Sequence, residues 1–203
     1  MKKRLISLMT ALLLLCSASA LAEETTASTL VVYFSVAENS AVDITSSASV
    51  TRWNDETVGT ISVLANMIHD RVGGDLYSID TDVEYPAETI IDFAAEEQER
   101  NDRPELIGTI EHWDSYDTVF VGYPTWWYDL PMVMYSFFDA YDFSGKTIIP
   151  FNTHNGSRFS GTIQTIEQLE PDAEVIPDGF TVNERNVTDV QEDIDAWLSK
   201  LGY

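Results

Sequence analysis

Apolar and polar positions follow one another in blocks that predict strands and helices in turn. The run TLVVYFS at 29–35 is almost entirely apolar, which is typical of a strand buried on both faces. The block at 60–74 places Ile61, Leu64 and Ile68 on one face of a helix and ends on two glycines that can cap it. These two blocks predict a strand followed by a helix.

The same succession continues to the end of the chain. Further strands are expected at 75–80, 116–124, 146–152 and 173–182. Further helices are expected at 88–101, 132–141, 161–169 and 188–201. Strict alternation predicts an α/β fold in which helices cover both faces of a parallel sheet. Because no repeat or linker interrupts the series, we expect one domain over 23–203.

Two segments do not follow the pattern. Residues 36–58 have weak periodicity, and residues 102–114 form a connector before the third strand. Irregular segments of this length in a compact domain usually serve a function. We therefore expect 36–58 to cover the binding site or to contact a partner.

The N-terminus has the pattern of a secretory signal peptide. Basic residues at 2–4 precede an apolar stretch shorter than a membrane span, and Ala20 and Ala22 provide a small-residue cleavage site. The sequence predicts a signal peptide over 1–22 and an exported, extracytoplasmic or secreted protein without a stable membrane span after cleavage. A retained anchor is the alternative. The single cysteine, Cys16, lies within this segment, so the mature chain would have neither disulfides nor thiolate chemistry.

The strong negative charge of the chain argues against nucleic acid and anionic membranes as partners. The chain holds 34 acidic and 11 basic residues, a formal net charge of −23, which repels nucleic acid and anionic lipid surfaces. The acidic surface either keeps the protein solvated or docks a cationic redox partner. Three scattered histidines predict no metal site.

Ligands of open parallel sheets bind outside the carboxyl ends of the strands. Three loops are expected there, at 35–60, 123–131 and 152–162, and all three are rich in small polar or aromatic residues. Gly59 and Thr60 begin a helix, whose free amides can bind phosphate, although an ordinary helix cap is the alternative. The third loop offers hydroxyl and amide groups beside Gly156, or it forms an ordinary turn.

The second loop contains two adjacent tryptophans between two prolines. Neighbouring side chains point in different directions on a strand and on a helix, so Trp126 and Trp127 cannot both enter one core by simple periodicity. Displayed on a loop, they would form a stacking surface for a flat ring. The alternative is that one tryptophan caps the core and the other covers a helix.

The segments LVVYFS, YDTVFVGYPTWWYDLPMVMYSFFDAYDFSGKTIIPF and THNGSRFSGTI resemble the flavodoxin-like family. In particular, the chain is similar to small, often exported flavodoxins with a GYPxWW loop. The resemblance implies a three-layer sandwich around a five-stranded parallel sheet of order 2-1-3-4-5. It also implies FMN as the bound cofactor.

The resemblance assigns three sets of residues to FMN. The phosphate set is Ser35, Gly59, Thr60 and Ile61. The set along the isoalloxazine ring is Pro124, Thr125, Trp126 and Trp127. The set at the other edge of the ring is Thr153, His154, Asn155, Gly156 and Ser160. This chain departs from the family at the phosphate loop, where residues 36–58 separate Ser35 from Gly59.

The implied function is electron transfer through non-covalently bound FMN, with a redox protein or a small electron acceptor as a further partner. The flavin performs the redox chemistry, and no side chain is needed as a catalytic group. His154 is either a loop residue or a proton donor. The alternatives are an NAD(P)H-dependent FMN reductase of quinone-type acceptors and a flavodoxin-like binding module that no longer holds flavin.

Overall fold

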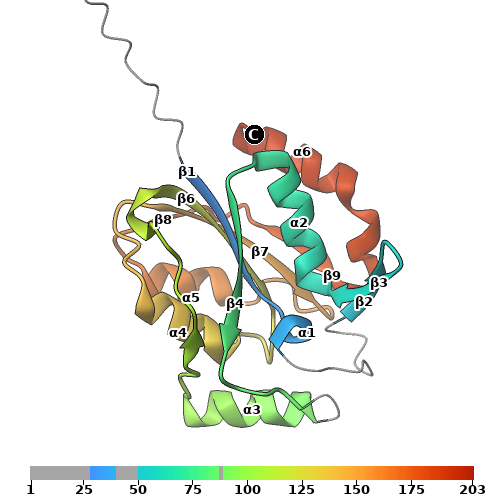
Figure 1. Ribbon diagram of the computed structural model, residues 1–203, viewed down its shortest axis with the longest axis vertical. Coiled ribbons are helices and arrows are strands. Elements are labelled where there is room, and N and C mark those ends of the chain that lie inside the picture. The colour runs from blue at the N-terminus through green and yellow to red at the C-terminus, as the bar shows by residue number, and fades with distance from the viewer. Residues whose placement is uncertain (1–27, 40–49, 87–88) are drawn as a thin grey trace, which may run out of the picture.

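The computed structural model describes residues 28–39, 50–86 and 89–203, so the predicted signal peptide lies outside the described residues. A twisted central sheet carries helices on both of its faces (Figure 1). The predicted α/β class is therefore confirmed.

Four long parallel strands form the centre of the sheet. They are β1 (Ser28–Phe34), β4 (Asp75–Thr81), β6 (Tyr116–Pro124) and β7 (Thr147–His154). Strand β1 lies between β4 and β6, and β7 lies beyond β6. The inner strands β1 and β6 are buried over nearly their whole length, as their continuous apolar sequences predict.

The edges of the sheet differ from the prediction. Three short strands complete the sheet: β5 (Leu106–Ile107), β8 (Glu174–Val175) and β9 (Phe180–Asn183). Strand β5 pairs antiparallel with β4, whereas β8 and β9 both pair parallel with β7. The parallel strands follow one another in the predicted order 2-1-3-4-5, with β8 and β9 together in the fifth place. The prediction of five strands that are all parallel was wrong, because the sheet has seven strands of mixed orientation. Pro177 lacks an N–H donor and stands where the expected strand 173–182 is broken.

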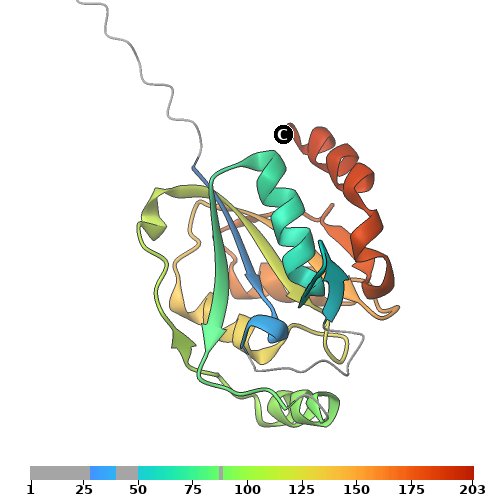
Figure 2. The same ribbon diagram turned by 45° about the vertical axis from the view of Figure 1, so that its right-hand side comes forward.

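The helices form a layer on each face of the sheet. Helices α2 (Thr60–Val72) and α6 (Gln191–Leu201) cover one face, and α4 (Met132–Ala140) and α5 (Thr162–Leu169) cover the other (Figures 1 and 2). Each layer encloses an apolar cluster, one centred on Leu64, Phe120 and Ile194 and the other on Phe34 and Phe137. The two clusters fix the sheet between its helices.

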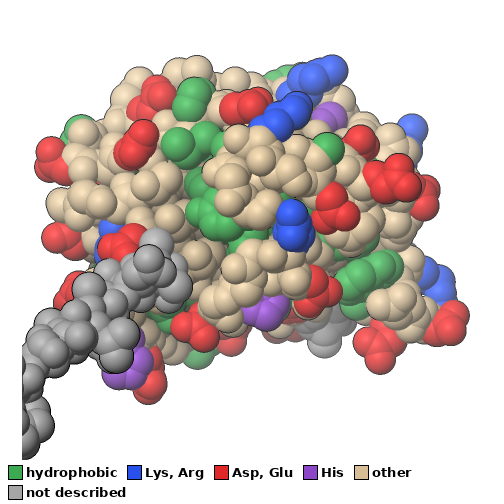
Figure 3. All heavy atoms as spheres, turned by 90° about the horizontal axis from the view of Figure 1, so that it is seen from above, with side chains coloured by type: hydrophobic (Ala, Val, Ile, Leu, Met, Phe, Trp, Pro, Cys, Tyr) green, Lys and Arg blue, Asp and Glu red, His purple; other side chains and the backbone are tan. Residues whose placement is uncertain are grey.

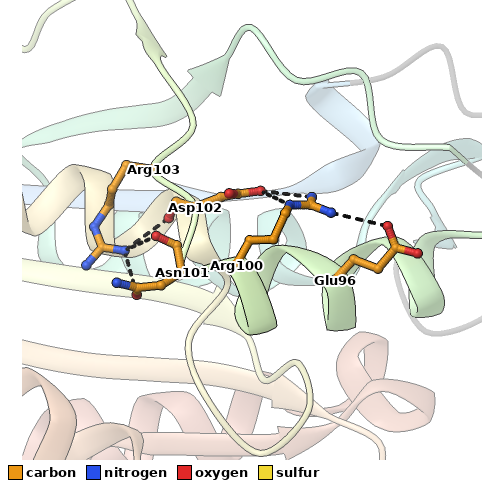
Figure 4. A network of polar contacts seen from close by, with 5 residues as sticks. All are labelled: Glu96, Arg100, Asn101, Asp102 and Arg103. Atoms are coloured by element: carbon orange, nitrogen blue, oxygen red, sulfur yellow. Dashed lines mark hydrogen bonds and ion pairs between the residues drawn. The ribbon is translucent and has the colours of Figure 1, made fainter.

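Helix α3 (Ile90–Arg100) lies outside this layer, at the end of the molecule where β1 and β4 finish (Figures 1 and 2). Its last turn is held by Arg100, which pairs with Glu96 at 3.2 Å and with Asp102 at 2.8 Å (Figure 4). Arg103 donates to the Asn101 side chain and, through Nε, to Asp139 on α4 at 2.8 Å. The Arg103 contact joins the segment after α3 to α4, and Gln98 of α3 donates to the Trp126 carbonyl in the loop that follows β6, at 3.1 Å.

The two irregular segments contain regular structure that the sequence did not predict. Residues 36–58 include α1 (Val36–Asn39), β2 (Val50–Trp53) and β3 (Glu56–Gly59), while 40–49 lie outside the described residues. Strands β2 and β3 form an antiparallel hairpin whose two turn residues, Asn54 and Asp55, have φ of 50° and 66°. The connector 102–114 includes β5 and leads into the short helix η1 (Trp113–Ser115), and a second short helix, η2 (Glu184–Asp189), follows β9.

Acidic side chains are scattered over the face opposite α3, with fewer lysines and arginines between them (Figure 3). Within 28–39, 50–86 and 89–203, no helix is long and apolar enough to span a bilayer.

Candidate functional site

A cavity of about 620 Å³ opens where the loops after β6 and β7 face the start of α3. Its volume lies in the range of small-molecule and cofactor sites. Its lining comes from α3, from the two loops and from the start of η2. The lining residues are Ile90, Ile91, Ala94, Pro124, Thr125, Trp126, Trp127, Tyr128, Thr153, His154, Asn155, Gly156, Ser157 and Glu184.

A tight turn displays the two tryptophans. Trp126 and Asp129 exchange two backbone hydrogen bonds, of 3.0 and 2.9 Å, around the central residues Trp127 and Tyr128. Both central residues have positive φ, 46° and 68°, which is costly for large side chains. The Asp129 carboxylate holds the turn because it accepts from the Leu130 N–H and the Tyr135 hydroxyl at 2.8 and 2.9 Å.

The turn directs the two indole rings to different surroundings. Trp126 packs edge-on against Phe34 and Tyr85, with ring centroids 5.7 and 5.5 Å apart. Trp127 is 50% exposed, and its Nε1 donates to the Ile91 carbonyl of α3 at 2.8 Å. The structure thus agrees with the alternative in which one tryptophan caps the core and the other covers a helix, since Trp126 extends the core and Trp127 contacts α3. Both rings also line the cavity, and their stacking on a flat ring stays a prediction.

The loop after β7 forms the opposite wall. Its start is joined to the tryptophan loop by a hydrogen bond from the Thr125 N–H to the Thr153 carbonyl, at 2.8 Å. The Gly156 N–H donates to Nδ1 of His154 at 2.8 Å, so the neutral ring carries its proton on Nε2. Burial, and then the charge of Arg158, lowers the pKa of His154. His154 therefore presents a neutral N–H donor near pH 7.

Glu184 supplies the acidic group of the cavity. It is 5% exposed, and burial raises the pKa of its carboxyl, while the charge of Arg185 acts in the opposite direction. None of the residues that line the cavity in the described structure is a lysine or an arginine. An anionic group bound here would have to be held by amides and hydroxyls.

The predicted phosphate residues lie beside the cavity and do not line it. Ser35, Thr60 and Ile61 are 1–2% exposed, and a Cβ added at Gly59 would fall 2.0 Å from Ser35 Oγ. Gly59 precedes α2 and provides no side-chain cap for it. The Thr60 hydroxyl lies 3.4 Å from that of Thr153, so the N-terminus of α2 meets the loop after β7.

The structure thus brings most of the predicted ring residues together. Both ring sets line the cavity except Ser160, whose hydroxyl donates to the Ser157 carbonyl. The sequence missed the α3 residues and Glu184, and it placed Tyr128 and Ser157 in the expected loops without assigning either of them to FMN. Glu184 follows the last strand at its carboxyl end, so the rule that located the three loops could also have located it.

The described residues contain no cluster of three or more histidine, cysteine, aspartate or glutamate side chains that could hold a metal ion. The cavity therefore offers aromatic surface, amides, hydroxyls, one histidine and one carboxyl. This set suits an organic ligand with a flat ring.

Three solved structures with a similar fold are informative. Proteins assigned as flavoproteins from Bacteroides uniformis ATCC 8492 and Bacteroides eggerthii DSM 20697 are both 24% identical to this chain, with TM-scores of 0.68 and 0.63. Their matches cover 85% and 87% of this chain and 98% of each of those chains. A Lactobacillus acidophilus NCFM flavoprotein, solved in complex with FMN, is 15% identical with a TM-score of 0.58, over 85% of this chain and 99% of that chain.

No curated protein matches this chain. The family model for flavodoxin matches residues 54–201, a span that includes the loops after β6 and β7 and the whole of α2. This match covers well over half of the sequence, and the similar structures share its fold. The chain belongs to the flavodoxin family.

Proposed function

We propose that this chain binds FMN in the cavity beside α3 and transfers electrons through it. The observation that carries the proposal is the pair of tryptophans, which face a cavity of suitable volume next to the N-terminus of α2, where Gly59 precedes the helix. The FMN complex of the similar Lactobacillus flavoprotein supports the choice of cofactor.

The residues of the chain have separate tasks in this proposal. Trp126 and Trp127 bind the flat ring, and Thr153, Asn155 and the loop amides satisfy its polar edge. The amides at the start of α2, with the Thr60 hydroxyl, hold the phosphate, in part through the helix dipole. FMN supplies the redox chemistry when bound.

The charge of the protein affects the same site. A net charge of −23 and the absence of lysine and arginine from the described cavity lining make additional negative charge on the ligand unfavourable. The acidic surface also suits a cationic redox partner, whose association would weaken as salt increases.

Titration of the apoprotein with FMN tests the proposal. We expect a flavin absorption spectrum that changes on binding, and about tenfold weaker binding by Trp127→Ala, which loses stacking without loss of core packing. Ile107→Ala is the matched control, because Ile107 is 50% exposed on β5 and does not line the cavity. Equal FMN affinity in wild type and Trp127→Ala, or no binding at all, would contradict the proposed site.

Two further measurements define the activity and the location. NADPH consumption by the FMN-loaded protein under air would indicate the reductase rather than the electron carrier. Export is proposed from the N-terminal sequence, and mass spectrometry should give a mature N-terminus between Leu21 and Glu24. An intact Met1 in the exported fraction would contradict cleavage.

A further inference from the structure

Glu184 is an ionisable group that the proposed electron transfer does not use. It is 5% exposed, lines the cavity and stands at the first position of η2. Within the described part of the chain, no hydrogen bond or ion pair reaches its carboxylate. A buried carboxylate without a partner is unfavourable, so the group has a reason to interact with whatever occupies the cavity.

Glu184 lies at the end of the cavity where the phosphate of a bound ligand would be held. Asn183, the residue before it, is the register partner of His154 in the pairing of β9 with β7. The neighbouring Thr153 hydroxyl lies 3.4 Å from the Thr60 hydroxyl at the start of α2, and η2 packs against α2. Glu184 is therefore close to the helix N-terminus that would hold a phosphate.

Among the described residues around this carboxylate, the opposing charge comes from Arg185, which is exposed and acts less strongly than burial. The first two turns of α2, over residues 60–67, have no titratable side chain, and neither does β9. β7 contributes His154, which is neutral near pH 7, and η2 contributes the exposed Arg185 and Asp189. An anion at the start of α2 would thus meet a negative charge that Arg185 offsets only in part whenever Glu184 is ionised.

We propose that Glu184 determines which flavin the cavity prefers. Ionised Glu184 disfavours the phosphate of FMN relative to the uncharged ribityl end of riboflavin, and protonated Glu184 does not. This inference rests on the proposed flavin site. It makes the preference for FMN over riboflavin decrease as pH rises through the pKa of Glu184, which burial raises.

Titration of the apoprotein with FMN and with riboflavin, from about pH 4.5 to about pH 8.5, measures this preference. In wild type, the ratio of the FMN to the riboflavin dissociation constant should rise with pH. In Glu184→Gln, that rise should be smaller, and FMN should bind about tenfold more tightly than to wild type at the alkaline end. Asp189→Asn is the matched control, because it removes one exposed acidic charge from the same short helix and should behave as wild type.

The comparison separates Glu184 from other titrating groups. His154 and the phosphate of FMN ionise in all three proteins, so their effects cancel between wild type and Glu184→Gln. Thermal unfolding of each apoprotein establishes that the variants are folded, and Glu184→Ala provides a second removal of the charge.

Three results would overturn the inference. The first is an unchanged pH profile in both Glu184 variants. The second is an equal loss of affinity for both flavins, which would assign the carboxylate to the part of the ligand that they share. The third is wild type that binds neither flavin at any pH, and only this result would also contradict the proposed function.

Discussion

The two ends of the proposed flavin site are built in different ways. At the ring end, Trp127 and Tyr128 are 50% and 71% exposed on a turn with positive φ. At the phosphate end, Ser35, Thr60 and Ile61 are almost fully buried. The exposed part of the ring end can therefore change with little effect on the fold, whereas the phosphate end cannot change without a change in the core.

The largest expected effect tests whether the two tryptophans at the ring end contribute equally to the stability of the fold. Trp126→Ala should lower the free energy of unfolding of the apoprotein by about 3 kcal/mol, because Trp126 packs against Phe34 and Tyr85. Trp127→Ala should lower it by less than about 1 kcal/mol. Chemical denaturation of both apoproteins measures the difference, and equal losses would show that the two rings are equivalent.

The next effect tests the packing of the phosphate end. Gly59→Ala should destabilise the apoprotein by about 2 kcal/mol, because the added methyl group would lie 2.0 Å from Ser35 Oγ. The double variant Ser35→Ala/Gly59→Ala removes that atom and should recover much of the loss. A double-mutant cycle by chemical denaturation measures the coupling. Strict additivity would show that Ser35 does not restrict residue 59.

A pH-dependent effect tests the packing of α3, the helix that lines the ring end of the site. Glu97, on α3, is 2% exposed, and burial raises the pKa of its carboxyl to about 7. The unfolded chain loses this proton near pH 4.5, so stability should fall as pH rises from about 4.5 to about 7. Glu97→Gln should remove about 1–2 kcal/mol of that fall, measured by denaturation across the range.

Glu99→Gln is the control for this experiment, because Glu99 is exposed on the same helix. Glu170, whose pKa burial also raises to about 7, is present in every protein compared and cancels from the difference. Parallel pH profiles of wild type and Glu97→Gln would contradict the assignment.

The smallest expected effect concerns the strained turn. Tyr128→Gly should stabilise the apoprotein by about 0.5–1 kcal/mol, because glycine adopts φ of 68° without steric cost. Tyr128→Ala also removes the ring but keeps the unfavourable φ, so it should give no gain. Unfolding temperatures of the two variants measure the strain, and equal values would show that the turn is relaxed.

The sequence predicted the centre of the fold well, because its strands are buried on both faces. The run at 116–124 coincides with β6, and the helix expected from residue 60 is α2. The prediction of one continuous fifth strand over 173–182 was wrong. The apolar pattern continues across Pro177, but proline cannot donate a hydrogen bond to the sheet there. The hairpin of β2 and β3 was missed because its strands are short and partly polar.

The site was less predictable for a related reason. The tryptophans and glycines of the two loops could be recognised from residue type and from their position at strand ends, and they predicted both walls of the cavity. The contribution of α3 depends on how a whole helix docks, through contacts such as Arg103 with Asp139 on α4. The burial of Glu184 likewise depends on the packing of η2 against α2, which no local pattern contains.

The short edge strands bear on how this protein behaves at high concentration. A long exposed edge strand offers a row of free backbone groups to which another chain can add, and this is a common start of aggregation. Here one edge ends in the two-residue β5, and the other is divided between β8 and β9 on either side of Pro177. Along the edge formed by β8 and β9, the described strands present no continuous ladder of useful length, so this edge resists extension by a second copy. On the other edge, β5 covers only Asp80 and Thr81 of β4, so residues 75–79 are where a second copy would add when crowding brings copies together.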